Sequence, residues 1–199
     1  MKKDKTDVNK ISLNINGQNT TDLKRVADEF NSYFTSVADE IREKIPRSKK
    51  DFKSYLRNRT RNSLFFSPIT KDEVLKTIKL LDLTKSTGPC SLPLKTLETV
   101  LDELSDIMKD IFNLSLQTGV FPKSLKNVRV VPVYKSKGSQ NDVSNYRPIS
   151  LLSNIDKVFE KLVYSRVISF FNTNHVLFKR QYGFRSKHST AHSLINIVV

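Results

Sequence analysis

Hydrophobic residues recur at helical spacing in several long stretches of this chain. Residues 20–46 carry seven apolar side chains three or four positions apart, and Pro46 closes the stretch. These seven are Leu23, Val26, Phe30, Phe34, Val37, Ile41 and Ile45. Residues 67–83 repeat the pattern behind Thr70 and Glu73, which have the spacing of a capping box. Both stretches are therefore predicted to be amphipathic helices.

A third helix is predicted over residues 94–119, with Gly119 at its C-terminal cap and Ile111 among its buried residues. Its carboxylates recur every four residues. They are Glu98, Asp102, Asp106 and Asp110. We expect this stripe to be an exposed face and not a metal site, because it drifts around the helix. Residues 154–172 predict a further helix, capped by Asn154.

From residue 121 onward the pattern becomes that of strands. Val128 to Tyr134 alternates as a strand does, and "NYRPISLL" reads as a second extended segment. Pro148 keeps Arg147 in extended backbone. Residues 177–190 suggest a hairpin or a bent loop around Gly183, followed by a helix or strand. The expected fold class is helix-rich α+β with a small antiparallel sheet.

Composition narrows the cellular setting. No apolar run approaches the ~20 residues that span a bilayer, and the first ten residues lack the apolar core of a signal peptide. The single cysteine, Cys90, excludes an internal disulfide and reads as a small apolar residue. We expect an intracellular protein, in nucleus or cytoplasm, that has no membrane partner and no recognised targeting signal.

Charge gives the first functional indication. The net charge is +14, and residues 122–199 contain 13 Lys or Arg against 3 Asp or Glu, a balance of +10. Such an excess favours a polyanion, with nucleic acid ahead of an anionic membrane surface. Residues 47–63 are also basic, with Phe52 and Tyr55 between the charges. They read equally well as a solvated linker or as an arm that contacts a nucleic-acid backbone.

Other candidate motifs carry little weight. Lys85 lacks the glycine spacing of a phosphate-binding loop. His188 and His192 are four residues apart, as zinc ligands on a helix are, but no third ligand is indicated. Ser189 beside His188 has no orienting third group, so no catalytic triad is predicted.

What remains is a basic constellation with aromatic residues inside it. Its members are Lys135, Lys137, Arg147, Gln181, Arg185 and Lys187, with Tyr182, Gly183 and Phe184. Arginine offers a fork for two phosphate oxygens and lysine a point charge, while exposed rings stack on bases. A basic surface with buried aromatic residues explains the same spacing equally well.

Three segments in series resemble a known family. "FPKSLKNVRVVPVYKSKG", "NYRPISLLSNIDKVFEKLV" and "QYGFRSKHSTAHSL" are similar to the opening segments of reverse transcriptases of non-LTR, jockey-like retrotransposons. Residues 22–118, with "ADEFNSYF" and "LDLTKSTGPCSLPLKTLE", look like the helical extension before the fingers of those polymerases. The chain departs at "GPCSLP", where relatives usually carry an acidic residue after Gly-Pro.

The resemblance implies a division of the chain and a set of roles. Residues 1–66 would be an N-terminal helix with a basic linker, 67–120 a helical extension, and 121–199 part of the fingers of a right-hand polymerase. Lys135 or Lys137 and Arg147 would grip the incoming triphosphate. The template and nucleotide would lie along Gln181, Gly183, Phe184 and Arg185. Partners of the full-length enzyme would be an RNA template, a primer and deoxynucleotides, with Mg²⁺ as its cofactor.

The carboxylates that bind metal in that family do not occur in this sequence. The chain has no Asp-Asp pair and ends before the first catalytic aspartate is expected, so the palm is absent. We expect no catalytic residue here and no polymerisation by this chain alone. It is then either a polymerase fragment or a non-catalytic RNA-binding module or relic. A helical interaction protein without a nucleic-acid role is a third reading, and an uncovered apolar face would favour self-association.

Overall fold

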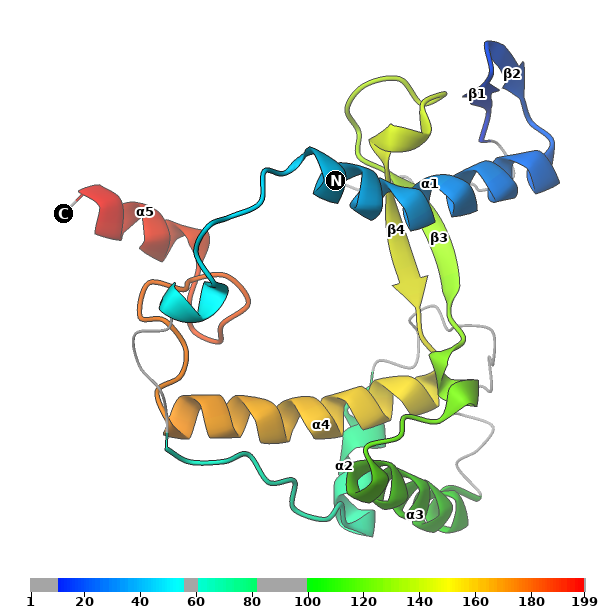
Figure 1. Ribbon diagram of the computed structural model, residues 1–199. Helices are drawn as coiled ribbons and strands as arrows, with labels where there is room; N and C mark the ends of the chain where they lie inside the picture. Colours follow the sequence, from blue (N-terminus) through cyan, green and yellow to red (C-terminus); the bar gives the residue numbers. More distant parts are fainter. Residues whose placement is uncertain (1–10, 56–60, 82–99, 199) are drawn as a thin grey trace. The chain divides into compact units, whose positions relative to one another are not determined.

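The computed structural model describes residues 11–55, 61–81 and 100–198, and the helices and strands of these ranges are labelled in Figure 1. Helices predominate, and the described residues form two small antiparallel sheets, so a helix-rich α+β fold is confirmed. The sequence features at Lys85, Cys90 and Glu98 lie outside the described residues.

The chain forms two compact units, each built from segments far apart in sequence. Of the described residues, 11–49 and 121–156 make the first unit. The second contains 50–55, 61–81, 100–120 and 157–198. The sequence-based division at residues 66 and 120 stays a prediction.

The first unit opens with a hairpin that the hydrophobic pattern did not predict. β1 (Leu13–Ile15) pairs antiparallel with β2 (Gln18–Thr20) across a two-residue turn. Asn16 and Gly17 both have positive φ, 53° and 84°, as the mirror-image turns of tight hairpins require. The Asn14 side chain accepts a hydrogen bond from the Gly17 amide at 3.0 Å and closes the turn.

Helix α1 (Leu23–Lys44) follows, and only its first half is buried. Asp22 caps it by accepting a hydrogen bond from the Arg25 amide at 2.8 Å. Val26 and Phe30 are buried, whereas Ile41 is 53% exposed. The predicted helix is confirmed, but its apolar stripe is covered only where the unit supplies a partner.

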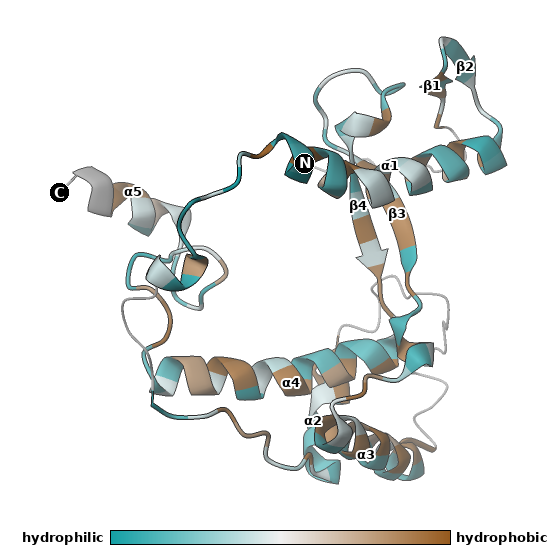
Figure 2. Cartoon of the chain, in the orientation of Figure 1, coloured by the Kyte–Doolittle hydropathy of each residue, from teal (hydrophilic) through white to brown (hydrophobic). Residues whose placement is uncertain are grey.

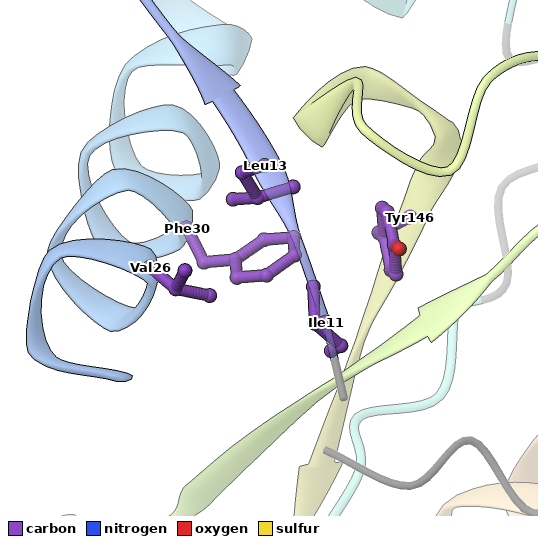
Figure 3. Close-up of a cluster of buried hydrophobic side chains, with 5 residues drawn as sticks. All are labelled: Ile11, Leu13, Val26, Phe30 and Tyr146. Atoms are coloured by element: carbon purple, nitrogen blue, oxygen red, sulfur yellow. The ribbon is translucent and has the colours of Figure 1, made fainter. Parts of the chain in front are cut away.

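That partner is a second, longer hairpin. β3 (Arg129–Tyr134) pairs antiparallel with β4 (Tyr146–Leu151), as the two predicted extended segments suggested. The short helical turns η4 (Lys123–Lys126) and η5 (Val143–Asn145) precede the two strands. The core of this unit combines side chains from β1, α1 and β4 (Figure 3). Its buried members are Ile11, Leu13, Val26, Phe30 and Tyr146.

The second unit is helical in its described residues. It comprises η2 (Phe52–Tyr55), α2 (Lys71–Lys79), α3 (Leu101–Thr118), the larger part of α4 (Asn154–Thr173) and α5 (Thr190–Val198). Phe112 of α3 stacks on Phe159 of α4, with ring centroids 4.5 Å apart and planes 5° from parallel. Val74, Met108 and Val158 are buried as well.

Arg166 joins α4 to the segment that leads into α2. Its side chain is 10% exposed, and its guanidinium donates to the carbonyl oxygens of Ser67 and Pro68 at 2.9 and 3.1 Å. It also donates to the Glu73 carboxylate at 3.0 Å. Buried cations are tolerated where they are paired and hydrogen-bonded, as this one is.

Several helix ends were predicted correctly and one cap was misplaced. Thr70 and Glu73 form both hydrogen bonds of a capping box, and Gly119 adopts a left-handed φ of 69° after α3. At the start of α4, Ser153 and Asp156 form a reciprocal pair one residue before the predicted cap, Asn154. Ile111, expected to be buried, is 44% exposed.

Among the described helices, none is both long enough and apolar enough to cross a membrane.

Candidate nucleic-acid interface

The register of the β3–β4 hairpin decides which way its side chains point. Pro132 lies opposite Pro148, and neither residue has a backbone N–H to donate. The Lys135 amide donates to the Asn145 carbonyl at 2.8 Å, so hydrogen-bonded pairs fall at every second position from there. The proline pair then occupies a non-hydrogen-bonded position. Two prolines can face each other here because neither residue of a non-hydrogen-bonded pair has to donate an N–H to the partner strand.

One face of the hairpin packs toward α1. Val130, Pro132 and Pro148 line an apolar groove of about 600 Å³ together with α1 residues such as Phe30 and Phe34. Figure 3 shows Tyr146 of β4 directed at Phe30, and their rings meet edge to face at 5.0 Å between centroids. This face is therefore structural.

The opposite face carries the basic residues. Arg147 pairs with Val133 in the register and is exposed. Because strand side chains alternate, Arg147 lies on the face away from α1. The same alternation puts Lys135, diagonal to it across the ladder, on that face, and diagonal neighbours are within reach of long side chains. Arg129, four residues before Val133, lies on the same face. Sequence reasoning did not select this cation, although the alternation of "RVVPVY" indicates it.

The turn between the strands holds Lys135 and Lys137. The Lys135 ammonium donates to the Ser144 carbonyl at 2.7 Å, while Lys137 is exposed. Gly138 has a φ of 80°, and a Cβ there would lie 2.6 Å from the Asn145 side-chain nitrogen. Asn145 in turn donates to the Ser139 carbonyl at 3.0 Å. The turn is thus fixed by its own hydrogen bonds before any ligand arrives.

Two more contacts tie this turn to the rest of its unit. The Tyr146 hydroxyl donates to the Gln140 carbonyl at 2.7 Å, and the Asn14 amide donates to the Asn141 carbonyl at 2.8 Å. Burial raises the pKa of the Tyr146 hydroxyl, and Tyr134 nearby adds to the effect. Tyr146 therefore stays protonated and keeps donating this bond at neutral pH.

The other predicted site residues lie in the second unit, on the bent loop after α4. The Gln181 amide and the Arg185 guanidinium both donate to the Phe178 carbonyl, at 3.0 and 3.4 Å. Phe184 is fully exposed with a positive φ of 58°. A Cβ on Gly183 would meet no atom within 4 Å, so packing does not require glycine there. An exposed ring beside a cation can stack on a nucleobase.

The structure thus brings the predicted residues together in two subsets. Lys135, Lys137 and Arg147 share one hairpin of the first unit, and Gln181, Gly183, Phe184 and Arg185 share one loop of the second. A single site made of all seven stays a prediction.

Three carboxylates of α3, those of Asp102, Asp106 and Asp110, are paired with lysines. Lys71 of α2 donates to Asp102 and Asp106 at 2.5 and 2.8 Å, and Lys109 contacts Asp106 and Asp110 at 3.3 and 3.4 Å. The hydrogen bond from Lys71, opposed by burial and aided by Lys109, lowers the pKa of Asp106. The hydrogen bonds that Lys71 donates to Asp102 and Asp106 raise the pKa of Lys71 above its ordinary value. Asp102 and Asp106 thus link α3 to α2 through Lys71.

A pair of catalytic Mg²⁺ ions does not fit the residues that the structure describes. Over the part of the chain that the structure describes, no group of three or more His, Cys, Asp or Glu side chains could hold a metal ion. His188 and His192 lie with ring centroids 6.5 Å apart. The His188 Nδ1 is 2.9 Å from the Ser186 carbonyl oxygen.

Comparison with known proteins finds relatives of this chain by sequence similarity. The RNA-directed DNA polymerase from mobile element jockey of Drosophila melanogaster is 32% identical over 149 residues, 75% of this chain. The corresponding polymerase of Drosophila funebris is 30% identical over 131 residues, 66% of the chain. The chain spans only 16% and 14% of the lengths of these two relatives. No family model matches it.

Proposed function

Because the chain is related by sequence to the RNA-directed DNA polymerases of jockey-like non-LTR retrotransposons, we propose that it is the extension and fingers portion of such a polymerase. In this proposal it binds the phosphates of nucleic acid or of an incoming nucleotide and contains no catalytic aspartates. The observation that carries the proposal is the shared basic face of Lys135 and Arg147 on a hairpin whose other face is held by α1.

Phosphate binding follows from the chemistry of that face. Arg147 projects from extended backbone that Pro148 restricts, so its guanidinium loses little further freedom when it forms two parallel hydrogen bonds to phosphate oxygens. Lys135 adds a point charge beside it and already lies against a carbonyl oxygen, which a phosphate oxygen would replace. Neutralised phosphates release counterions, so binding would weaken steeply as salt rises.

The loop of the second unit would contribute the base contacts. Phe184 offers a fully exposed ring, and Arg185 lies next to it in the chain. Stacking of this kind tolerates any base, because every base has a π-face. The proposal therefore expects affinity for single-stranded RNA with weak sequence preference.

The test is RNA binding by the purified 199-residue chain. Binding is measured by fluorescence anisotropy at a series of salt concentrations. Arg147→Ala and Arg185→Ala should each weaken binding and lower the salt slope by about 1. Arg42→Ala is the matched control, because Arg42 is an exposed arginine of α1 that forms an i,i+3 pair with Asp39, at 3.1 Å. If all three variants bind with the affinity and slope of the parent chain, the proposed interface is wrong.

A non-catalytic RNA-binding module is the second candidate. The ion pairs of Asp102, Asp106 and Asp110 with Lys71 and Lys109 favour it for this chain taken alone. Both candidates share the RNA interface and differ in whether a longer polypeptide adds the chemistry.

A further inference from the structure

Helix α3 has two apolar faces, and only one of them is covered. The buried face presents Met108 and Phe112 to the other helices of its unit. A second row runs beside it and is exposed: Val100 is 47%, Ile107 57% and Leu114 61% exposed. Figure 2 shows that α3 carries both strongly hydrophobic and strongly hydrophilic residues.

The exposed row has the spacing of a helix-pairing seam. Together with Leu104, which is half-buried, its members are Val100, Ile107, Ile111 and Leu114. Their separations along the chain are four, three, four and three, which is the a/d repeat of a coiled coil. Val100 is the N-cap of α3, and the other four members cover about 15 Å of the helix. We call these five residues the α3 seam.

The outer border of the seam is acidic. Glu103 and Asp110 are seven residues apart, both are exposed, and both occupy the heptad position that flanks such a seam on its solvent side. Lys109 contacts Asp110 at 3.4 Å but projects from the other side of it. The inner border consists of residues such as Met108 and Ser115, which are buried within the unit.

We propose that the α3 seam docks an amphipathic helix whose flanking positions are lysine or arginine. The repeat selects a helix, because only a helix places apolar side chains at alternating intervals of three and four. The acidic border selects basic flanks, because opposite charges at these positions set partner choice in coiled coils. This inference does not depend on the proposed nucleic-acid function.

A second copy of this chain fits the seam poorly. In an antiparallel pair, the Glu103 and Asp110 borders of the two copies would face each other and repel. In a parallel pair, each acidic border would meet the inner border of its partner, and that border is buried within the unit. The occupant is therefore a different helix.

The test uses two designed helical peptides of about three heptads, identical in their leucine seam. One carries lysine and the other glutamate at the flanking positions. Binding of each to the purified chain is followed by fluorescence anisotropy at moderate salt. The proposal predicts that the lysine peptide binds at least tenfold more tightly. Because the whole chain has a net charge of +14, unspecific attraction would favour the glutamate peptide, and that result would overturn the proposal.

Variants locate the binding on α3. Ile107→Gln should weaken the lysine peptide at least tenfold, whereas Ile41→Gln should not. Ile41 is the matched control because it is an α1 isoleucine with nearly the same exposure, 53% against 57%. Replacing both Glu103 and Asp110 with lysine should reverse the preference between the peptides. Ile107, Glu103 and Asp110 are all exposed, so the variants should melt like the parent chain.

Sedimentation of the chain without peptide completes the experiment. A monomer at the concentrations used supports a seam reserved for another helix. A dimer that Ile107→Gln abolishes would overturn the proposal in favour of self-association.

Discussion

The ring of Phe30 in α1 meets the ring of Tyr146 in β4 edge to face, with centroids 5.0 Å apart. Tyr146 directly precedes Arg147 and braces the basic turn through its hydroxyl. Helix α1 is thus part of the core on which the β3–β4 hairpin rests. The candidate interface depends on residues far from it in sequence.

Phe30→Ala should therefore destabilise the first unit by about 3–5 kcal/mol, because it removes a buried ring and leaves a cavity. Amide hydrogen exchange at Asn14 and Lys135, whose amides donate hydrogen bonds within this unit, measures the loss. Phe52→Ala is the control, since Phe52 is 71% exposed and should change stability by less than about 0.5 kcal/mol. Equal exchange in the two variants would contradict this account of the core.

Gly138→Ala should disturb the turn that carries Lys135 and Lys137. A left-handed φ of 80° and a Cβ placed 2.6 Å from the Asn145 side chain both oppose alanine, at a cost of about 1–3 kcal/mol. Gly183→Ala, where a Cβ meets nothing within 4 Å, should be close to neutral. Thermal unfolding of the two variants checks the difference. A Gly138→Ala protein as stable as Gly183→Ala would mean that the turn does not need its glycine.

Acid should loosen the second unit through Glu73. Burial alone would raise the pKa of Glu73, but hydrogen bonds from the Thr70 amide and from Arg166 prevail and lower it below its ordinary value of 4.5. Because the pKa of Glu73 is lower in the folded state than in the unfolded state, its ionised form stabilises the fold. This stabilisation is fully present above the unfolded-state pKa and is lost as the pH falls through the folded-state pKa. Glu73→Gln should cost about 1–2 kcal/mol at pH 7, discounted for the 41% exposure of Glu73.

Urea unfolding of the parent chain and Glu73→Gln between pH 7 and pH 3 measures this dependence. The gap between the two should narrow as the pH falls below 4.5. Asp39→Asn removes an exposed pair on α1 and should change stability by no more than about 0.5 kcal/mol. A gap that stays constant down to pH 3 would show that Glu73 does not act through its charge.

Local signals in the sequence predicted the fold well. The capping box at Thr70 and Glu73 and the left-handed Gly119 are decided by neighbouring residues, so sequence reasoning found both. The hairpin at Asn16 and Gly17 had an equally local signal, an Asn-Gly pair directly after the alternating apolar residues Ile11, Leu13 and Ile15, and was overlooked.

Long-range packing was the part that the sequence did not disclose. Periodicity identified the apolar stripe of α1 but not the point at which its partner ends: Val26 is buried, whereas Ile41 farther along the stripe is exposed. The contact between Arg166 and Glu73 joins residues 93 positions apart, and no pattern in either segment indicates it. For the candidate site, Pro148 correctly indicated extended backbone at Arg147. The strand register, which places Arg147 and Lys135 on the same face, could be seen only in the structure.

The purified chain should not extend a primer. The residues described offer no group of carboxylates for two metal ions, and the sequence has no Asp-Asp pair. A primer-extension assay on an RNA template with Mg²⁺ or Mn²⁺ should therefore give no template-dependent product. Products that disappear when the template is omitted would contradict the proposal that this chain is not catalytic by itself.

The most direct test of the central claim is a titration of the chain with a deoxynucleoside triphosphate and, separately, with the matching nucleoside. If Lys135 and Arg147 grip phosphates, the triphosphate binds, the nucleoside does not, and Arg147→Ala weakens triphosphate binding about tenfold, or about 1.4 kcal/mol. Arg42→Ala should leave it unchanged. Triphosphate binding that is equally strong in Arg147→Ala and in the parent chain would contradict the claim.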